Sequence, residues 1–151
     1  MSTAIAELID GLEIFRDFSY RELEVLGGHL GQMNAAAGSV IFNEGDPGSH
    51  MLILISGRIS IYKTGENGRH LLSYENKGRV IGEMALLDHE RRSALCVAET
   101  DCALLTLTHD GLDRLAAGQP ALAYRFMLAL ARLLSRRLRR TSGVLAEHLL
   151  N

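Results

Sequence analysis

Short apolar runs separated by glycine-rich turns fill the middle of the chain, from residue 38 to residue 108. Runs of this length, bounded by glycine and polar residues, are typical of strands. Turns such as "EGDPG" and "TGENG" are short enough to join antiparallel neighbours. The pattern predicts an antiparallel β-domain, either a barrel or a jelly roll. The runs are "VIF", "MLILI", "RISIY", "HLLSY", "RVI", "ALCVA" and "ALLTL".

Helices are predicted on both sides of this β-region. Apolar residues recur at helical spacing from Ile5 to Leu12, and Ser19 can cap a second helix with Glu22 completing a capping box. A long helix is expected from about 120 to 141, followed by an amphipathic segment at 143–151. We therefore expect one α+β domain over residues 1–151, helical at 1–34, β at 35–108 and helical again at 109–151.

Composition excludes several classes of protein. A net charge of −2 gives no overall attraction to nucleic acid or to an anionic membrane. Cys96 and Cys102 form no CxxC pair and no disulfide framework, and they are too few for an iron–sulfur cluster. The N-terminus lacks a basic start, and no apolar run approaches spanning length. We expect a soluble, cytoplasmic protein.

Histidine placement gives no support for a metal-dependent β-fold enzyme. The histidines show neither His-x-His nor i,i+4 helical spacing, and the sequence offers no nucleophile–base pair. We therefore expect neither a metal nor an enzymatic activity. The histidines are His29, His50, His70, His89, His109 and His148.

The segment "GEMALLDHERRSA" (residues 82–94) sets charges beside apolar strands. An anion is well bound by a guanidinium together with backbone N–H groups at a helix start, and Gly82, the turn in "EMALL" and an arginine at 91 or 92 supply these parts. Glu83 instead accepts hydrogen bonds from a hydroxyl. The pattern fits a ligand with a phosphate and a sugar hydroxyl. From spacing alone, a simple Glu83–Arg92 ion pair is the commoner arrangement.

Strand periodicity separates the two arginines. In "RSALCV", Arg92 shares a face with Ala94 and Cys96, and the other face carries Ser93, Leu95 and Val97. Small residues beside Arg92 leave room for a ligand, whereas we expect Leu95 and Val97 to fill the core. This favours Arg92 as the ligand-binding residue and Arg91 as a solvated loop residue. Close packing of the small residues is the alternative reading.

At these residues the sequence resembles the cyclic nucleotide-binding domains of bacterial catabolite activator proteins, cyclic-nucleotide-dependent kinases and cyclic-nucleotide-gated channels. The phosphate-binding cassette of that family reads G-E-x-A-L followed by R-[ATS]-A, matched here by Gly82-Glu83-Met84-Ala85-Leu86 and Arg92-Ser93-Ala94. The stretch "IFNEGDPGSHMLILISGRISIY" (41–62) resembles the other hallmark of the family, a glycine-rich turn between two strands. The resemblance spans about residues 12 to 141.

The resemblance implies a β-roll with helices at both ends and a cyclic nucleotide, cAMP or cGMP, as ligand. It places the ribose 2′-hydroxyl on Glu83 and the cyclic phosphate on Arg92. The cradle is completed by Ser93 and the backbone of Gly82, Met84 and Ala85, with Ala94 closing the motif. Arg91 departs from the pattern, because many members carry proline there. The turn at 45–48 resembles an anion loop, but we interpret it as structural, as it is in the family.

The long C-terminal helix carries an apolar stripe of Phe126, Leu130, Leu133, Leu134 and Leu138. In the resembled family this helix caps the base, which makes Arg132, Leu133 and Arg136 the candidate cap residues here. A permanently docked helix or a homodimer through this helix would give the same stripe. The arginines at 136–140 can contact DNA, anionic lipid or a protein, although a basic solvent face is the commoner explanation.

These observations favour a regulatory module that binds a cyclic nucleotide, with cAMP favoured, and signals through its C-terminal helix to a protein partner in trans. A cGMP-selective or ligand-free interaction domain of the same fold is the alternative. A transcription regulator of the catabolite-activator type would carry a helix-turn-helix after the long helix, and this sequence ends at Asn151 without one. We therefore expect no DNA partner.

Overall fold

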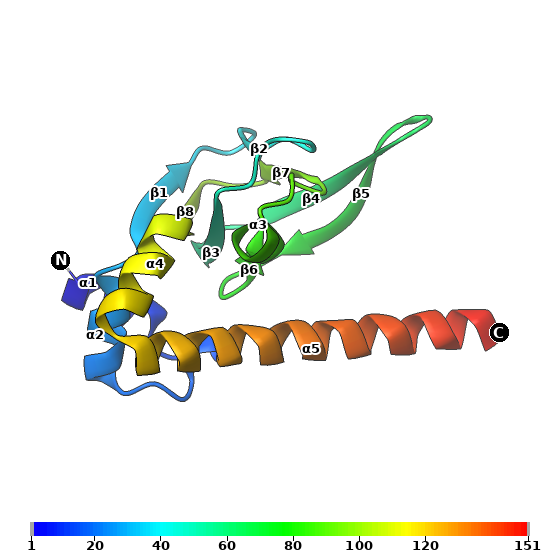
Figure 1. Cartoon of the computed structure of the whole chain (residues 1–151). Coiled ribbons are helices and arrows are strands. Elements are labelled where there is room, and N and C mark those ends of the chain that lie inside the picture. The colour runs from blue at the N-terminus through cyan, green and yellow to red at the C-terminus, as the bar shows by residue number, and fades with distance from the viewer. Residues whose placement is uncertain (1, 151) are drawn as a thin grey trace.

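The chain forms a two-sheet β-roll that lies against a group of helices (Figure 1). The computed structural model describes residues 2–150, apart from the side chains of residues 2, 3 and 85. This arrangement confirms the α+β class and the β-roll flanked by N-terminal helices and a long C-terminal helix. The helices are α1 (Ser2–Ile9), η1 (Glu13–Phe15, a 3-10 turn), α2 (Tyr20–Gly27), α3 (Glu83–Asp88), α4 (His109–Gly118) and α5 (Pro120–Leu150).

The strands pair antiparallel throughout and form two sheets, with the orders β1-β8-β3-β6 and β2-β7-β4-β5. Neighbours in each sheet are mostly distant in sequence, as in a jelly roll. Only β4 and β5 form a hairpin with each other. The strands are β1 (Gly31–Ala35), β2 (Val40–Phe42), β3 (His50–Ser56), β4 (Ile59–Gly65), β5 (Gly68–Glu75), β6 (Val80–Ile81), β7 (Leu95–Ala98) and β8 (Cys102–Thr108).

Strand β3 lies between two hydrophobic cores. Its side chains alternate, so that Met51 and Ile53 join a core shared with the helices, whereas Leu52 and Leu54 point into the roll. All four are fully buried. A strand buried on both faces reads as a continuous apolar run, which is why "MLILI" has no polar alternation.

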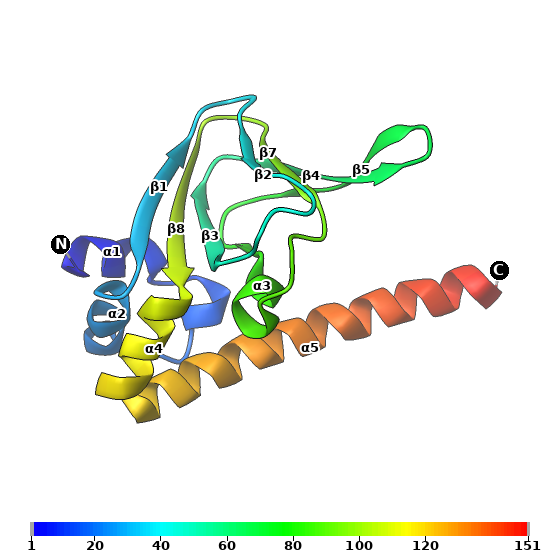
Figure 2. The ribbon, with the colours of Figure 1, turned by 45° about the horizontal axis from the view of Figure 1, so that its top comes forward.

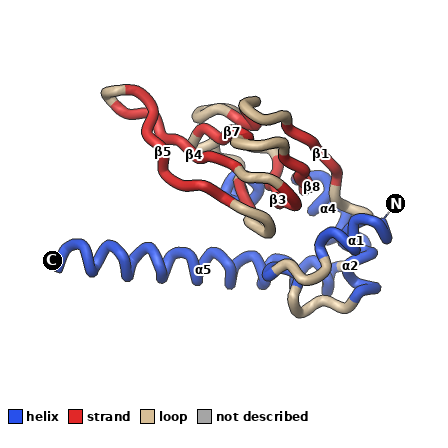
Figure 3. Tube along the Cα trace, turned by 180° about the vertical axis from the view of Figure 1, so that it is seen from behind, coloured by secondary structure: helices blue, strands red, loops and turns tan. Residues whose placement is uncertain are grey.

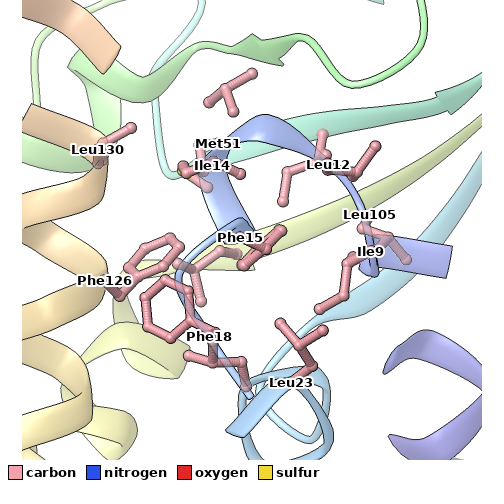
Figure 4. Packing of buried hydrophobic residues seen from close by; sticks show 14 of the residues in the cluster. Ile9, Leu12, Ile14, Phe15, Phe18, Leu23, Met51, Leu105, Phe126 and Leu130 are labelled. Atoms are coloured by element: carbon pink, nitrogen blue, oxygen red, sulfur yellow. The ribbon is translucent and has the colours of Figure 1, made fainter. Parts of the chain in front are cut away.

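Helix α5 is held by the first of these cores. Phe126 stacks on Phe15 of η1 with ring centroids 6.0 Å apart, and Leu130 is fully buried beside them (Figure 4). From this anchor α5 runs beneath the roll, and α3 lies over its middle (Figure 2). Seen from behind, the C-terminal part of α5 extends past the roll on the side of the β4–β5 hairpin (Figure 3).

Two local features differ from the sequence prediction. Residues 31–35 form β1 although we expected helical structure to residue 34; this strand has mostly exposed side chains and no apolar alternation. Helix α5 continues through Gly143 to Leu150, where we expected a separate segment. One glycine costs a helix about 1 kcal/mol and need not end it. The capping box of Ser19 and Glu22 is confirmed.

No helix within residues 2–150 is both long enough and apolar enough to cross a membrane.

The docking of α5 gives a stability prediction. Phe126→Ala removes a side chain that is 1% exposed, and we expect the free energy of unfolding to fall by about 3–5 kcal/mol because a cavity remains. Tyr124→Ala, on the same helix but 67% exposed, should change it by less than about 0.5 kcal/mol. Urea unfolding followed by circular dichroism measures both. Equal losses would show that the stack on Phe15 does not hold α5.

Candidate functional site

A cavity of about 250 Å³ opens between α3, the end of β2, β4 and the loop before β7. It gathers most of the residues predicted for the ligand site: Gly82, Glu83, Met84, Arg92, Ser93 and Ala94. The Ala85 side chain lies outside the described part of the structure. The remaining lining residues are Phe42, Ile61, Ile81, Asp88, Glu90 and Arg91. The cassette, residues 82–94, therefore forms one wall of a real cavity.

The guanidinium of Arg92 is the main charge in this cavity. The residue is 5% exposed, and its Nη1 and Nη2 atoms donate to the carbonyl oxygens of Gly82 (3.2 Å) and His50 (2.7 Å). Its charge also lies 4.4 Å from the ring centre of Phe42. Carbonyl dipoles and an aromatic face stabilise a cation but do not neutralise it.

Arg92 makes no ion pair with a carboxylate of the described residues. Burial lowers the pKa of this guanidinium below its ordinary value, and the nearby Cys96, Asp46 and Glu83 oppose the shift only in part. A buried cation without a counter-ion is costly unless an anion compensates it. The cavity is therefore suited to a small anionic ligand.

The turn after β2 fixes the backbone of Arg92. Gly45 N donates to Arg92 O and Arg92 N donates to Asp46 O, both at 2.8 Å. The Asp46 side chain in turn accepts from Asn43 N at 2.9 Å. Arg91 is exposed and donates to the Gly45 carbonyl at 2.9 Å. These hydrogen bonds give the turn a structural role, because it fixes the backbone that places Arg92 in the interior and Arg91 at the exposed rim of the cavity.

Gly82 allows the guanidinium to lie against the backbone. Its φ of +74° is in the left-handed region, and an added Cβ atom would lie 2.2 Å from Arg92 Nη1. A side chain at this position would occupy the place of the guanidinium. The glycine of the cassette is therefore required by a close approach as well as by backbone conformation.

Glu83 pairs with the C-terminal helix and not with Arg92. Its Oε1 accepts from Arg137 Nη1 at 3.1 Å, and Arg137 Nη2 donates to Val80 O at 3.0 Å. Glu83 is 9% exposed, so the pair is largely shielded from solvent. The simple Glu83–Arg92 ion pair considered from spacing is thus replaced by a contact across 54 residues.

The Arg137 side chain is not fully satisfied in this arrangement. Its Nε atom is buried and has no hydrogen-bond acceptor. Burial lowers the pKa of the guanidinium; Glu83 opposes that shift, and the positive charge of Arg79 adds to it. A buried donor without an acceptor costs about 1–3 kcal/mol, which offsets part of the stabilisation from the Glu83 and Val80 contacts.

The candidate cap residues on α5 do not line the cavity in this structure. Leu133 is 5% exposed and belongs to the core shared with the helices. Arg136 pairs with Glu13 at 3.0 Å, and Arg132 is exposed. Capping of a base by these residues stays a prediction. Among the described residues, the ion pair between α5 and the cassette is made by Arg137, and sequence periodicity could not identify it.

The strand-face argument is confirmed in placing Arg92 in the interior, where it is 5% exposed, but it was wrong about the core. Cys96 is fully buried inside the roll, whereas Leu95 and Val97 are half-buried on the outer face. Space between the sheets at β7 suits small side chains, so the small residues are the core residues here. Burial raises the pKa of the Cys96 thiol to about 12, which keeps it neutral.

Metal chemistry finds no support in the described residues. Within residues 2–150 no three histidine, cysteine or acidic side chains converge on a point where an ion would bind.

Gly82→Ala tests the contact between the cassette backbone and Arg92. We expect the free energy of unfolding to fall by roughly 2–4 kcal/mol, from the left-handed φ and the displaced guanidinium together. Gly38→Ala, with φ +85° and nothing within 4 Å of an added Cβ, is the matched control and should cost only about 1–2 kcal/mol. Urea denaturation measures both variants, and equal losses would argue against the close approach.

Comparison with known proteins agrees with this geometry. The family model of the cyclic nucleotide-binding domain matches residues 32–119. The chain is 28% identical to a CRP-like cAMP-activated global transcriptional regulator of Mycobacterium tuberculosis, over 93% of this chain and 62% of that protein. It is 32% identical to the cyclic AMP receptor protein of Thermus thermophilus, over 85% of this chain and 58% of that protein. It thus spans about three fifths of these relatives.

A solved structure is similar over nearly the whole chain. A cyclic nucleotide-binding domain from Methylobacillus flagellatus superimposes with a TM-score of 0.83 at 29% identity, covering 94% of this chain and 80% of that one. The region matched by the family model runs from the second residue of β1 to the end of α4 and includes every residue of the cassette. The chain belongs to the cyclic nucleotide-binding domain family.

Proposed function

We propose that this chain binds a 3′,5′-cyclic mononucleotide, with cAMP favoured over cGMP, and acts as a regulatory module. The observation that carries the proposal is the buried, unpaired guanidinium of Arg92 in a cavity that also holds the Glu83 carboxylate. A cyclic phosphate supplies the single negative charge that Arg92 lacks. A ribose hydroxyl supplies the donor that a carboxylate accepts.

The two side chains keep free capacity for such a ligand. A guanidinium has five N–H groups, and two of those on Arg92 are used by the carbonyl oxygens of Gly82 and His50. The rest can donate to a phosphate. On Glu83, Oε1 accepts from Arg137, which leaves Oε2 for the ribose 2′-hydroxyl. Ser93 lines the same cavity and adds a hydroxyl.

The base preference rests on the relatives. The two curated relatives carry cAMP or cyclic AMP in their names, and cAMP is therefore the ligand we expect here. The Ser93 hydroxyl leaves cGMP as the alternative ligand, because it can accept from a guanine amino group. The role we propose is recognition, not catalysis, because the charged groups of the cavity match a phosphate and a hydroxyl.

The proposed output is through α5 to a protein in trans or to a second copy of the chain. Arg137 links α5 to Glu83, so a ligand that uses Glu83 alters a contact of the helix. The last turns of α5 carry leucines on one face that are 55–74% exposed and available to a partner. These leucines are Leu138, Leu145 and Leu149.

Replacing Arg92 tests whether this residue binds the phosphate, and replacing Arg91 is the control. Arg92→Ala should weaken cAMP binding by on the order of 100-fold, about 3 kcal/mol, because a buried phosphate loses its charge-assisted partner. Arg91→Ala removes the same charge from an exposed residue and should change affinity by less than about threefold. Calorimetry measures affinity, and thermal unfolding confirms that each variant folds. Absence of binding to wild type would refute the proposal.

Arg137 tests whether α5 senses the ligand. In wild type, saturating cAMP should slow hydrogen exchange along residues 131–150, because Glu83 couples ligand and helix. In Arg137→Ala, cAMP should still bind through Arg92, but the change in exchange on α5 should disappear. Arg136→Ala, which loses a pair with Glu13 instead, is the control and should retain it. An unaltered response in Arg137→Ala would mean that the signal leaves by another route.

A further inference from the structure

Two hollows lie on the other side of Arg137 from the cassette cavity. The first, about 430 Å³, is enclosed by the α1–η1 turn, the β5–β6 turn and α5. The second, about 350 Å³, continues along α5 and is lined by Arg79, Arg137, Arg140, Thr141 and Val144. They share Arg79 and Arg137 and therefore adjoin along α5, and we refer to the two together as a groove. Figure 1 shows the β5–β6 turn extending from the roll toward the N-terminal half of α5.

The lining of this groove is strongly basic. It contains Lys77, Arg79, Arg137 and Arg140, against the single carboxylate of Glu13, which already pairs with Arg136. We call the recess that these four cations line the basic groove. The whole chain has a net charge of −2, so the excess of positive charge is local. Arg137 and Arg140 belong to the arginine-rich segment 136–140, and a solvated helix face alone does not explain why they line a recess.

Ion pairs account for only half of these cations. Arg79 pairs with Glu75 at 2.8 Å and Arg137 with Glu83 at 3.1 Å. Lys77 and Arg140 make no ion pair with any described carboxylate. Structural salt bridges between α5 and the roll therefore explain Arg79 and Arg137 but leave Lys77 and Arg140 without a role.

The guanidiniums are close enough to repel each other. Arg79 and Arg140 both disfavour the charged form of Arg137, in addition to the larger effect of its burial. The Nε atom of Arg137 also lacks an acceptor. Like charges gathered around a recess, with a donor left unsatisfied, are stabilised by a bound anion.

We propose that the basic groove is a second ligand site that binds a phosphate-bearing polyanion with at least two phosphate groups. Three guanidiniums and an ammonium along a recess match phosphates that follow one another, and Arg140 and Arg79 can each bind one of them in a bidentate manner. Thr141 adds a hydroxyl donor. Leu133 and Val144 provide apolar walls for the rest of the ligand.

Arg137 connects this groove to the cassette. It lines both hollows and also pairs with Glu83, so an anion in the groove competes with Glu83 for the same guanidinium. By linkage, occupancy of the groove and occupancy of the cassette then influence each other. Anion binding in the groove can nevertheless be tested separately from the proposed nucleotide function, because Arg92 and the other charged residues that line the cassette cavity do not line the groove.

Tripolyphosphate is a suitable probe for calorimetry on the full chain at low ionic strength, with sodium chloride at matched ionic strength as the control. Arg140→Ala should weaken binding at least tenfold, and Lys77→Ala several-fold. Arg139→Ala is the matched control, because Arg139 is an exposed arginine on the same helix that lines neither hollow. It should change affinity less than twofold. Both exposed arginines can be replaced without disturbing the core.

Absence of tripolyphosphate binding, or equal losses in Arg140→Ala and Arg139→Ala, would overturn the proposal, since the latter indicates diffuse attraction to a basic helix. A second experiment distinguishes a lipid headgroup from a soluble ligand. It measures co-sedimentation of the protein with phosphatidylcholine vesicles that contain phosphatidic acid. Co-sedimentation that is lost in Arg140→Ala and displaced by tripolyphosphate would support the site with a lipid headgroup as ligand. Tripolyphosphate binding without vesicle binding would support it with a soluble ligand.

Discussion

The positive charge of Arg92, buried without a carboxylate partner, is the constraint on which the architecture of the site depends. Two carbonyl oxygens, one aromatic ring and a glycine with positive φ are arranged around this one group. None of them neutralises it, so the domain folds around a buried charge that has no counter-ion among the described residues. This explains why three distant segments, the turn after β2, the start of β3 and the cassette, meet here.

The first core determines where α5 contacts the cassette. Phe126 and Leu130 fix the N-terminal part of α5 against η1, and this fixes where Arg137, two to three turns later, meets α3. Beyond Arg137 the helix has only exposed residues. The Glu83–Arg137 pair therefore lies near the point where α5 passes from a buried anchor to a segment with exposed side chains only.

The features that the sequence could predict are those that depend on residues close together along the chain. The capping box at Ser19 and the apolar strands were predicted because they depend on residues a few positions apart. The cassette residues were predicted because chemistry restricts which side chains can bind a phosphate and a hydroxyl. Strand β1 was missed because its pairing with β8, and not its own pattern, makes it a strand.

Contacts between distant segments were beyond sequence reasoning. Phe42 and His50 reach Arg92 from other strands, and Arg137 reaches Glu83 from a helix 54 residues later. In the sequence Arg137 is one of several arginines on the polar face of the predicted helix, and helical periodicity does not distinguish it from the others. Only the position of α5 under α3 makes it different from Arg136 and Arg140.

The chemistry of arginine explains why such a link can be specific. Arg137 uses one terminal nitrogen on the Glu83 carboxylate and the other on the Val80 carbonyl, so a single rigid plane spans a side chain of α3 and the backbone of β6. A lysine ammonium has one nitrogen and would hold either acceptor without fixing an orientation. In the proposed function, movement of Glu83 toward a ligand hydroxyl would turn the guanidinium, and the Val80 contact would resist that turn. The pair would then respond to the position of the carboxylate, and not only to its charge, which is what a helix must sense if it is to report an occupied cassette.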